Sequence, residues 1–367
     1  MALSLVPGAR PEPAWPLSDM RAITFQAPRS LEVASVPDPE ILDPRDVVVK
    51  LELGAICGSD LHVYRGDEAG LDRGTILGHE FLGEVVETGS DVQKWKAGER
   101  VVSPFSSSCG GCLFCSRGLT SRCSHGAVYG WVQKGEGLQG AQAEYIRVPF
   151  ADTDLVAVPS DHPAEEVLLI GDILSTAFFC AENGGVSKGV ATCVLGCGPV
   201  GLLAVQAARE LGADPLFAVD AVPERLGLAE RFGATAISFT TDDPKACIQK
   251  YTGGFGVDVV LEVVGNASAS KLAYELIRPG GTISAAGVHN EDHFAFSPGA
   301  AYDKNLTYKA GRAPARHYME RMLELLQQKR LDITPLISHR MALADAVRGY
   351  EIFDNKLEGA IKILVEP

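Results

Sequence analysis

A short apolar run, Val190–Leu195, leads directly into the turn Gly196-Cys197-Gly198-Pro199-Val200-Gly201. Glycines spaced as G-x-G-x-x-G between a strand and a helix allow a tight turn, a close approach of backbone amides to a pyrophosphate, and tight packing of the helix on the strand. The positive end of the helix then faces the anion. The segment therefore predicts a dinucleotide site formed by Gly196, Gly198, Pro199, Val200 and Gly201.

The next apolar run ends at an acidic residue, Asp220, which lies 19 residues after Gly201. A carboxylate there accepts hydrogen bonds from both hydroxyls of the adenosine ribose and repels a 2′-phosphate, which favours NAD over NADP. Arg225 lies one helical turn further along and is a candidate to flank the ribose, although a solvated helix charge explains it equally well. The competing hypothesis is a doubly wound fold whose glycine turn binds nothing.

Buried strands and helices alternate from about residue 164 to about residue 288, which predicts a parallel sheet with helices on both faces. The expected strands are Val190–Leu195, Leu216–Val219, Val257–Glu262 and Thr282–Ala286, and the expected helices are Val200–Leu211, Pro223–Phe232 and Ser268–Ile277. Up to about residue 159, short runs rich in Val and Leu, such as Val47–Leu53 and Phe81–Thr88, are separated by glycine turns. These runs predict a mostly β domain.

The tail from about residue 301 mixes one expected helix, His317–Gln328, with short strands. It is too small to fold alone, so we expect it to complete the first domain. The expected division is a mostly β domain over residues 1–163, a doubly wound α/β domain over 164–304, and a C-terminal segment over 305–367.

The charge balance limits the partners of the chain. Its 367 residues carry 33 Lys and Arg against 47 Asp and Glu, a net charge of 33 − 47 = −14. An acidic protein repels phosphate backbones, so nucleic acid is not an expected partner. The uncharged stretch Gly189–Ala208 contains glycines and a proline that would break a membrane-spanning helix, and Met1–Pro16 lacks a signal-peptide core. We therefore expect a cytoplasmic protein with no membrane contact.

Nine cysteines, an odd number, in a chain without a secretory signal argue against a disulfide framework. Four of them lie in one lobe over residues 104–126, with the spacing C-x2-C-x2-C-x7-C: Cys109, Cys112, Cys115 and Cys123. Four thiolates close a tetrahedral shell around zinc, so the predicted site is structural, and we expect the lobe to pack near a subunit interface. An iron–sulfur cluster is the alternative, but the ferredoxin run has its fourth cysteine after three residues and before proline. The cysteines outside metal patterns are expected in the core: Cys180, Cys193, Cys197 and Cys247.

Three residues far apart in the sequence indicate a second metal site. Cys57 begins Cys57-Gly58-Ser59-Asp60-Leu61-His62, His79 lies in Gly78-His79-Glu80, and Asp172 lies in an otherwise apolar stretch. A thiolate, an imidazole and a carboxylate leave the fourth tetrahedral position open, as a catalytic zinc requires. Each residue also has a structural interpretation: a core cysteine, a hydrogen-bonded core histidine, and a helix N-cap. Spacing alone leaves both interpretations open.

Taken together, these motifs resemble those of the zinc-dependent medium-chain alcohol dehydrogenases. The motifs follow one another in the family's order: the Cys57–His62 segment, Gly-His-Glu, the four-cysteine lobe, the glycine turn and its acidic residue. The resemblance extends from about residue 20 to the C-terminus. The resemblance implies a GroES-like, mostly β catalytic domain and a Rossmann coenzyme domain. It also implies two zinc ions per chain, one catalytic and one structural, and hydride transfer between NAD and an alcohol or aldehyde hydrate.

The resemblance further implies roles for single residues. Cys57, His79 and Asp172 match the catalytic zinc ligands, and Glu80 matches a glutamate that exchanges onto the metal, with water as the other candidate for the fourth position. Asp60 would orient the ligand histidine.

Ser59 would hydrogen-bond the substrate oxygen, and His62 would end the proton relay. Lys362 and Arg312 are two candidates to reach the coenzyme pyrophosphate, with a surface charge as the alternative for each.

Segments 138–145 and 148–152, and Gly171-Asp172 ahead of Thr176, are similar to the formaldehyde dehydrogenase-like branch of the family. The long insertion of the glutathione-independent enzymes is absent between Cys123 and Gly140, which argues against product retention and dismutation. A polyol dehydrogenase is another alternative. A zinc-free reductase would lack both cysteine patterns, and a non-catalytic NAD- and zinc-binding structural or sensor protein would not need the Ser59–His62 pair. The resemblance also implies a homo-oligomer, a tetramer over a dimer, that acts on a small-molecule substrate.

Overall fold

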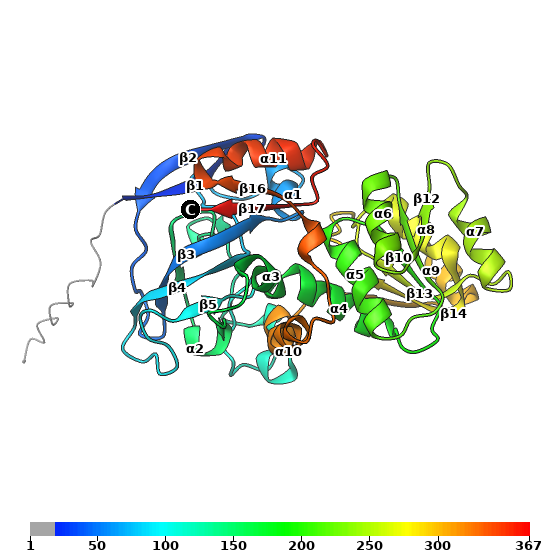
Figure 1. Cartoon of the computed structure of the whole chain (residues 1–367), viewed down its shortest axis with the longest axis horizontal. Coiled ribbons are helices and arrows are strands. Elements are labelled where there is room, and N and C mark those ends of the chain that lie inside the picture. The colour runs from blue at the N-terminus through cyan, green and yellow to red at the C-terminus, as the bar shows by residue number, and fades with distance from the viewer. Residues whose placement is uncertain (1–18) are drawn as a thin grey trace, which may run out of the picture.

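The structure is a computed structural model that describes residues 19–367, which form two lobes lying side by side (Figure 1). One lobe contains a mostly antiparallel sheet made from early and late parts of the chain, and the other contains a parallel sheet from its middle. The expectation about Met1–Pro16 lies outside the described residues. Across residues 19–367, none of the helices combines the length and the apolar character that crossing a membrane requires.

Six parallel strands form the second lobe's sheet, in the order β12-β11-β10-β13-β14-β15. Their bounds are β10 (Thr192–Leu195), β11 (Leu216–Asp220), β12 (Thr235–Ser238), β13 (Val257–Glu262), β14 (Ile277–Ala285) and β15 (Thr307–Ala310). The chain enters this sheet at its middle, winds outward on one side and then returns to wind outward on the other. The segments that follow β10 and β13 therefore diverge and leave a crevice at the carboxyl ends of these strands.

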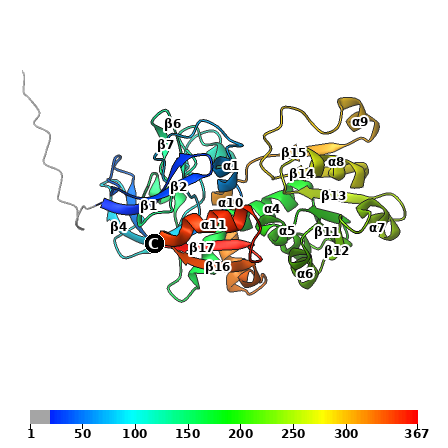
Figure 2. The ribbon, with the colours of Figure 1, turned by 90° about the horizontal axis from the view of Figure 1, so that it is seen from above.

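Helices cover both faces of the parallel sheet, with α5 and α6 on one side and α8 on the other (Figure 2). Every residue of β10 and β11 is buried, because helices cover both faces of the sheet, and most of these residues are apolar. The helices of this lobe are α5 (Pro199–Glu210), α6 (Pro223–Arg231), α7 (Pro244–Tyr251), α8 (Ala267–Leu276) and α9 (Pro298–Asp303).

Seven strands form the main sheet of the first lobe, in the order β16-β17-β3-β4-β5-β9 with β8 paired to β3. The last strand of the chain, β17, lies beside β3, and β16 pairs with the other edge of β17, so the C-terminal segment contributes two strands to this sheet. The strands are β3 (Val47–Ile56), β4 (Phe81–Thr88), β5 (Arg100–Val102), β8 (Tyr145–Val148), β9 (Val156–Ala157), β16 (Ile337–Ala342) and β17 (Lys362–Glu366). Two hairpins, β1 (Asp19–Ala27) with β2 (Ser30–Pro37) and β6 (Trp131–Gln133) with β7 (Glu136–Leu138), flank this sheet. The expected fold class, a mostly β domain with a doubly wound parallel-sheet domain, is confirmed.

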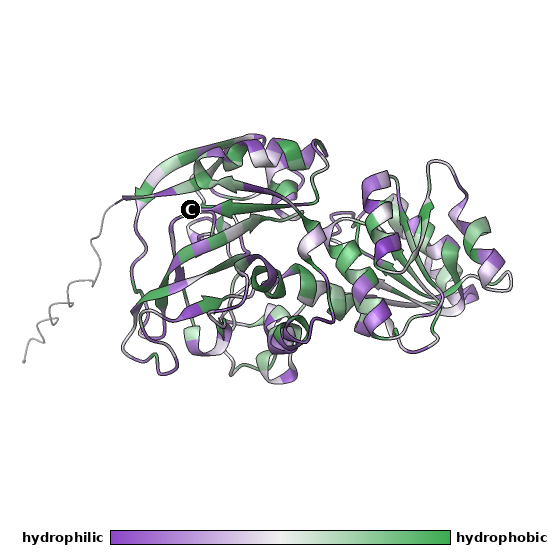
Figure 3. Cartoon of the chain, viewed as in Figure 1, coloured by the Kyte–Doolittle hydropathy of each residue, from purple (hydrophilic) through white to green (hydrophobic). Residues whose placement is uncertain are grey.

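The largest apolar cluster lies where the lobes meet. α4 (Ile173–Gly184) contributes Leu174 and Phe178, α5 contributes Leu203, and α10 (Ala315–Gln327) contributes Met319 and Met322. Figure 3 shows the apolar residues concentrated along the strands. Full burial of such a side chain is worth about 1.5–3 kcal/mol, so this cluster contributes strongly to holding the lobes together.

The structure departs from the sequence-based expectations at three places. The parallel sheet includes β15, so it continues past the boundary expected at residue 304. β12 and α7 were not expected at all, because a four-residue edge strand and a short, mostly exposed helix carry too few apolar positions to show a clear period. α7 depends instead on its N-cap, where Asp243 accepts hydrogen bonds from the backbone N–H groups of Lys245 and Ala246.

The glycine turn gives a test of this packing. A Cβ on Gly201 would lie 1.7 Å from the carbonyl oxygen of Gly196, whereas a Cβ on Gly227 in the middle of α6 would meet no atom within 4 Å. We expect Gly201→Ala to lower the free energy of unfolding by about 1–3 kcal/mol or more. The matched control Gly227→Ala should raise it by up to ~1 kcal/mol, because alanine favours the helix. Urea denaturation measures both, and equal effects would contradict the close contact.

Candidate active site

One cavity of about 1600 Å³ connects the two groups of residues singled out in the sequence. It runs from the loop after β3 across the junction of the lobes to the carboxyl ends of the parallel strands. Its lining includes most of the predicted site residues: Cys57, Ser59, Asp60, His62, His79, Asp172, Gly196, Gly198, Pro199, Val200, Gly201, Asp220 and Arg225. The structure thus places the candidate metal ligands and the glycine turn in one cleft.

Three segments bring Cys57, His79 and Asp172 together. Cys57 follows β3, His79 lies just before β4, and Asp172 precedes α4. The Sγ of Cys57 and the Nε2 of His79 each lie 3.3 Å from Oδ2 of Asp172, and the three ligand atoms all lie within 4.8 Å of one another. All three residues are buried. A core cysteine and a core histidine would not require a carboxylate between them, so the cluster favours the metal interpretation.

Asp172 occupies the N-cap position of α4, which was its alternative interpretation. Its side chain, however, makes no capping hydrogen bond to the helix backbone. One carboxylate oxygen accepts a bond of 3.3 Å from the hydroxyl of Thr176, and the other faces Cys57 and His79. The position is therefore that of a cap, while the carboxylate is directed at the cluster.

Asp60 fixes the orientation of two members of the cluster. Its Oδ1 lies 3.0 Å from Nδ1 of His79, which leaves Nε2 free to face Asp172, and its Oδ2 accepts the backbone N–H of Cys57 at 2.9 Å. Gln142 donates to the same Oδ2 at 3.5 Å and accepts the hydroxyl of Tyr350 at 2.7 Å. The supporting roles of Gln142 and Tyr350 were not anticipated, because no sequence pattern links them to Asp60.

The electrostatics of the cluster suit a cation. Burial and the charges of Asp172 and Glu80 raise the pKa of the Cys57 thiol. Burial opposes a charge on His79, but Asp60 and Asp172 outweigh it and raise the pKa of the imidazole well above 6.5. Burial also opposes a charge on Asp172, yet its contact with His79 lowers the pKa of the carboxyl. The carboxylates thus hold a proton on His79 that a metal ion would replace.

Glu80 and Lys362 form a second buried pair beside the cluster. Their side chains contact each other through Oε2 and Nζ, both are 0% exposed, and Nζ also donates to the carbonyl of Ile56 at 3.2 Å. Burial raises the pKa of Glu80 to about 6, although Lys362 acts to lower it. The expectation of a surface charge at Lys362 is wrong, because β17 places this residue in the middle of the β lobe. Oε1 of Glu80 is buried without a hydrogen-bond partner.

Ser59 and His62 belong to the turn and first helix that follow Cys57. The Ser59 hydroxyl lies 3.2 Å from Nε2 of His79, at the edge of the cluster, and α1 (Asp60–Arg65) carries His62 one turn further on. Both residues line the cavity, and Nδ1 of His62 lies 3.8 Å from a carboxylate oxygen of Asp67. The hydroxyl is therefore close to the cluster, while the imidazole lies further along the cleft wall.

The four lobe cysteines also converge, with their sulfur atoms within 4.8 Å of one another. Backbone N–H groups of Cys109 and His125 point at the sulfur of Cys123, at 3.2 and 3.4 Å, and the backbone N–H groups of Cys115 and Ser124 help lower the pKa of Cys112 to about 5. Such amide contacts stabilise thiolates, the form that binds metal. None of the nine cysteines forms a disulfide in the described structure, and Cys180, Cys193 and Cys197 are buried as expected, whereas Cys247 is half-buried.

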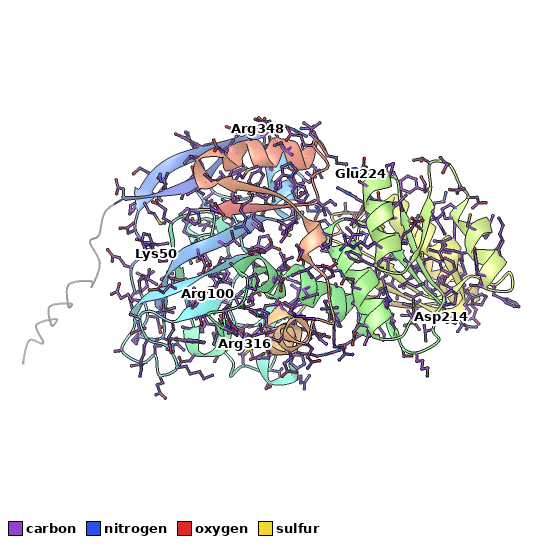
Figure 4. The ribbon with its side chains drawn as sticks, in the orientation of Figure 1. Lys50, Arg100, Asp214, Glu224, Arg316 and Arg348 are labelled. Carbon is purple, nitrogen blue, oxygen red and sulfur yellow. The ribbon has the colours of Figure 1, made fainter. Side chains whose placement is uncertain are left out.

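The lobe is anchored to the rest of the chain at its base. The buried carboxylate of Asp154 in α2 (Ala151–Asp154) accepts the backbone N–H of Ser108 at 2.8 Å and its hydroxyl at 2.6 Å. Arg316 of α10, labelled in Figure 4, donates to the carbonyl of Thr153 at 2.6 Å. Residues next to the first cysteine are thereby tied to the junction of the lobes.

At the other end of the cleft, Asp220 holds the glycine turn. One carboxylate oxygen accepts the backbone N–H of Cys197 at 2.6 Å, and the other accepts those of Ala221 and Val222 at 2.7 and 2.9 Å. Gly198 is the N-cap of α5, so the first amides of this helix face the cleft. A pyrophosphate fits such a helix end, because the amides there have no partners in the helix.

Arg225 and Arg312 both line the cleft. Burial and the charge of Arg122 lower the pKa of Arg312, whose backbone carbonyl accepts the hydroxyl of Ser121 from the four-cysteine lobe at 2.9 Å. Arg312 therefore stays a candidate for contacting an anion in the cleft, whereas the ammonium of Lys362, a residue that also lines the cavity, is already paired with Glu80.

The buried Glu80–Lys362 pair gives a stability test. We expect Lys362→Met to lower the free energy of unfolding by roughly 3–5 kcal/mol, because it leaves a carboxylate buried without its cation. The double variant Glu80→Gln with Lys362→Met should recover most of this loss, since no charge is then stranded. Urea denaturation of the wild-type protein, both single variants and the double variant gives the coupling, and additive losses would show that the two residues act independently.

Two family models match the chain. The alcohol dehydrogenase GroES-like domain matches residues 43–160, and the zinc-binding dehydrogenase model matches residues 199–328. A relative in Aspergillus flavus, named zinc-type alcohol dehydrogenase B, is 39% identical over 345 residues, which are 91% of this chain and 79% of that protein.

Solved structures agree with the family models. An alcohol dehydrogenase from Thermus sp. ATN1 superimposes with a TM-score of 0.89 at 40% identity, covering 95% of this chain and 99% of that one. A zinc-binding dehydrogenase from Sinorhizobium meliloti 1021, solved with NADP bound, has a TM-score of 0.82 at 28% identity, with 95% and 100% covered. Together with the fold, these matches show that the chain belongs to the zinc-dependent medium-chain alcohol dehydrogenase family.

Proposed function

We propose that this protein is an NAD-dependent zinc alcohol dehydrogenase that interconverts a small alcohol and its aldehyde or ketone. The observation that supports this most is the buried cluster of Cys57, His79 and Asp172, which opens into the same cleft as the glycine turn. A substrate at the cluster and a dinucleotide at the turn would then meet within one cavity.

The donor set fits a catalytic zinc. Cys57, His79 and Asp172 would hold the ion with one sulfur, one nitrogen and one oxygen, which leaves a fourth position for a substrate oxygen. When bound there, zinc would supply a Lewis acid that lowers the pKa of an alcohol. Cys109, Cys112, Cys115 and Cys123 would hold a second, structural zinc.

The chain's own residues would move the proton. Ser59, close to Nε2 of His79, would accept the hydrogen bond of the substrate hydroxyl. His62 would pass the proton toward solvent, because one imidazole nitrogen can take up a proton while the other releases one. Asp60 keeps His79 in the orientation that the cluster needs. Glu80, whose Oε1 has no hydrogen-bond partner, is the nearby carboxylate that would compete with water for the open position.

The glycine turn and Asp220 support NAD as the coenzyme. NAD would supply the hydride acceptor. Its pyrophosphate would lie at the N-terminus of α5, and its adenosine ribose would lie at Asp220, with Arg225 beside the ribose. Because the relative from Sinorhizobium was solved with NADP bound, the activity of this protein should be measured with NADP as well as with NAD.

The substrate class separates the remaining candidates. A formaldehyde dehydrogenase-like enzyme would prefer aldehyde hydrates, and a polyol dehydrogenase would prefer diols and sugar alcohols. We would measure NADH formation with short primary alcohols, aldehyde hydrates, diols and polyols on protein of known zinc content. A fully zinc-loaded protein that binds NADH but oxidises none of them would favour the structural or sensor alternative. We still predict that the protein forms a homo-oligomer, with a tetramer favoured over a dimer. The cytoplasmic location also stays a prediction.

We predict that Asp172→Ala lowers the zinc content from two ions per chain to one and lowers turnover by at least about a hundredfold, since the open site loses a ligand. Metal analysis and initial rates measure the two effects. Asp242→Ala, at an exposed aspartate outside the cavity lining, is the control and should change neither. If the Asp172 variant keeps two ions, Glu80 is the third ligand and our assignment of Asp172 is wrong.

We predict that Asp220→Ser raises the NADP-to-NAD ratio of kcat/KM by about tenfold or more, because a carboxylate beside a 2′-phosphate is a costly like-charge contact. Glu224→Gln is the control for a general charge effect: Glu224 is an exposed residue of α6 (Figure 4). An equal shift in both variants, or none in the Asp220 variant, would remove Asp220 from coenzyme selection.

A further inference from the structure

A second acid–histidine network, not used in the mechanism above, lies at the end of β13. Glu262, whose side chain is 1% exposed, accepts the backbone N–H groups of Val264 and Gly265 on Oε1, at 2.9 and 2.8 Å. Its Oε2 lies 2.7 Å from Nε2 of His289, in the loop after β14. The other ring nitrogen of His289 lies 3.0 Å from a carboxylate oxygen of Glu291.

This arrangement decides the protonation of His289. An ionised carboxylate only accepts hydrogen bonds, and a neutral imidazole has a single N–H, so both contacts are satisfied only by the imidazolium. Burial opposes this charge, but hydrogen bonds to Glu262 and Glu291 outweigh it and raise the pKa of His289 above 6.5. Two carboxylates and one imidazolium leave this part of the cleft with one net negative charge.

The network joins two loops at a place where their backbones touch. The carbonyl of Glu262 accepts the N–H groups of Ala286 and Gly287 at 2.9 and 3.2 Å, and a Cβ on Gly287 would lie 2.3 Å from the nitrogen of Gly265. The first loop also presses on the glycine turn, since a Cβ on Gly196 would lie 2.5 Å from a methyl group of Val264. A shift of either loop would therefore reach the dinucleotide site.

Residues of both loops line the cleft beside the glycine turn, among them Val264, Val288, His289 and Glu291. We propose that His289 is a positioning residue for the bound dinucleotide, which fastens the loop after β14 to the end of β13 and offsets one of the two carboxylate charges there. This inference rests on the proposed coenzyme. It implies that binding of the dinucleotide at this face of the cleft depends on one proton, the one held by His289.

The sign of the pH dependence follows from the charges. The bridge is fully present below the ordinary pKa near 6.5 and is lost as the pH rises through the raised pKa of His289. Loss of the His289 proton removes one hydrogen-bond donor. It also makes this wall of the cleft more negative, which disfavours a polyanionic ligand. Two other ionisable groups interact electrostatically with the network: Tyr308 of β15, whose pKa is raised by burial, Glu262 and Glu291, and Cys180 of α4, whose pKa is raised by burial and Glu262. Asp292 and His293 of the same loop line the cleft.

The test is the dissociation constant of NADH, measured by fluorescence on the intact zinc-loaded protein from about pH 6 to about pH 10. In the wild-type protein we expect the constant to rise about tenfold as one proton is lost. His289→Gln should weaken binding at low pH and remove this rise. Glu291→Gln should move the rise to lower pH, because one of the two groups that raise the pKa of His289 is gone. Asp303→Asn, at an exposed residue of α9 outside the cavity lining, is the control and should keep the wild-type profile.

Each outcome decides the inference. A His289→Gln protein that keeps the wild-type pH profile overturns the inference, because the proton that controls binding then belongs to another group. A change in thermal stability alone would not rescue the inference, since a purely structural role does not produce a one-proton profile. If that variant does not fold, Glu291→Gln decides, and an unmoved profile overturns the inference. Wild-type protein that binds no NADH at any pH would overturn the proposed coenzyme as well, whereas tight but pH-independent binding overturns only the role of His289.

Discussion

The buried charges beside the junction of the lobes set the main constraint on this structure. Cys57, His79, Asp172 and Glu80 are removed from water, where an isolated charge is costly. Each charged group is therefore paired: His79 lies between Asp60 and Asp172, and Lys362 lies against Glu80. The cluster can keep this composition only because β3, β4, β17 and α4 hold the partners in place, and a divalent cation would replace protons within it.

The two lobes supply different halves of one site. The β lobe provides Cys57 and His79 next to the rigid strands β3 and β4, while the parallel sheet provides the glycine turn where its winding reverses. Asp172 connects the halves, since it starts α4, the helix whose apolar side chains enter the shared core. The apolar contacts between the lobes thus determine whether ligand and coenzyme positions face the same cavity.

The buried carboxylates have different kinds of partners at the two ends of the cleft. At the cluster, the pairs Asp60–His79 and Glu80–Lys362 are buried, so removing one partner strands the other. At the glycine-turn end, Asp220 and Glu262 are satisfied mainly by backbone amides, and Glu262 also contacts His289. The first arrangement pairs side chains with side chains, and the second pairs carboxylates mainly with the backbone.

The sequence alone determined the elements with strong periods and the motifs whose residues are neighbours in the chain. The runs Val257–Glu262 and Phe81–Thr88 appear as strands with the expected bounds, and the glycine turn follows β10, because local spacing dictates such features. Only the tertiary structure decided which distant groups meet. It buried Lys362 against Glu80, directed one carboxylate oxygen of the cap residue Asp172 at Cys57 and His79, joined β15 to the parallel sheet, and brought His289 between two carboxylates. None of these has a spacing signal, since each depends on packing between segments that are separate in sequence.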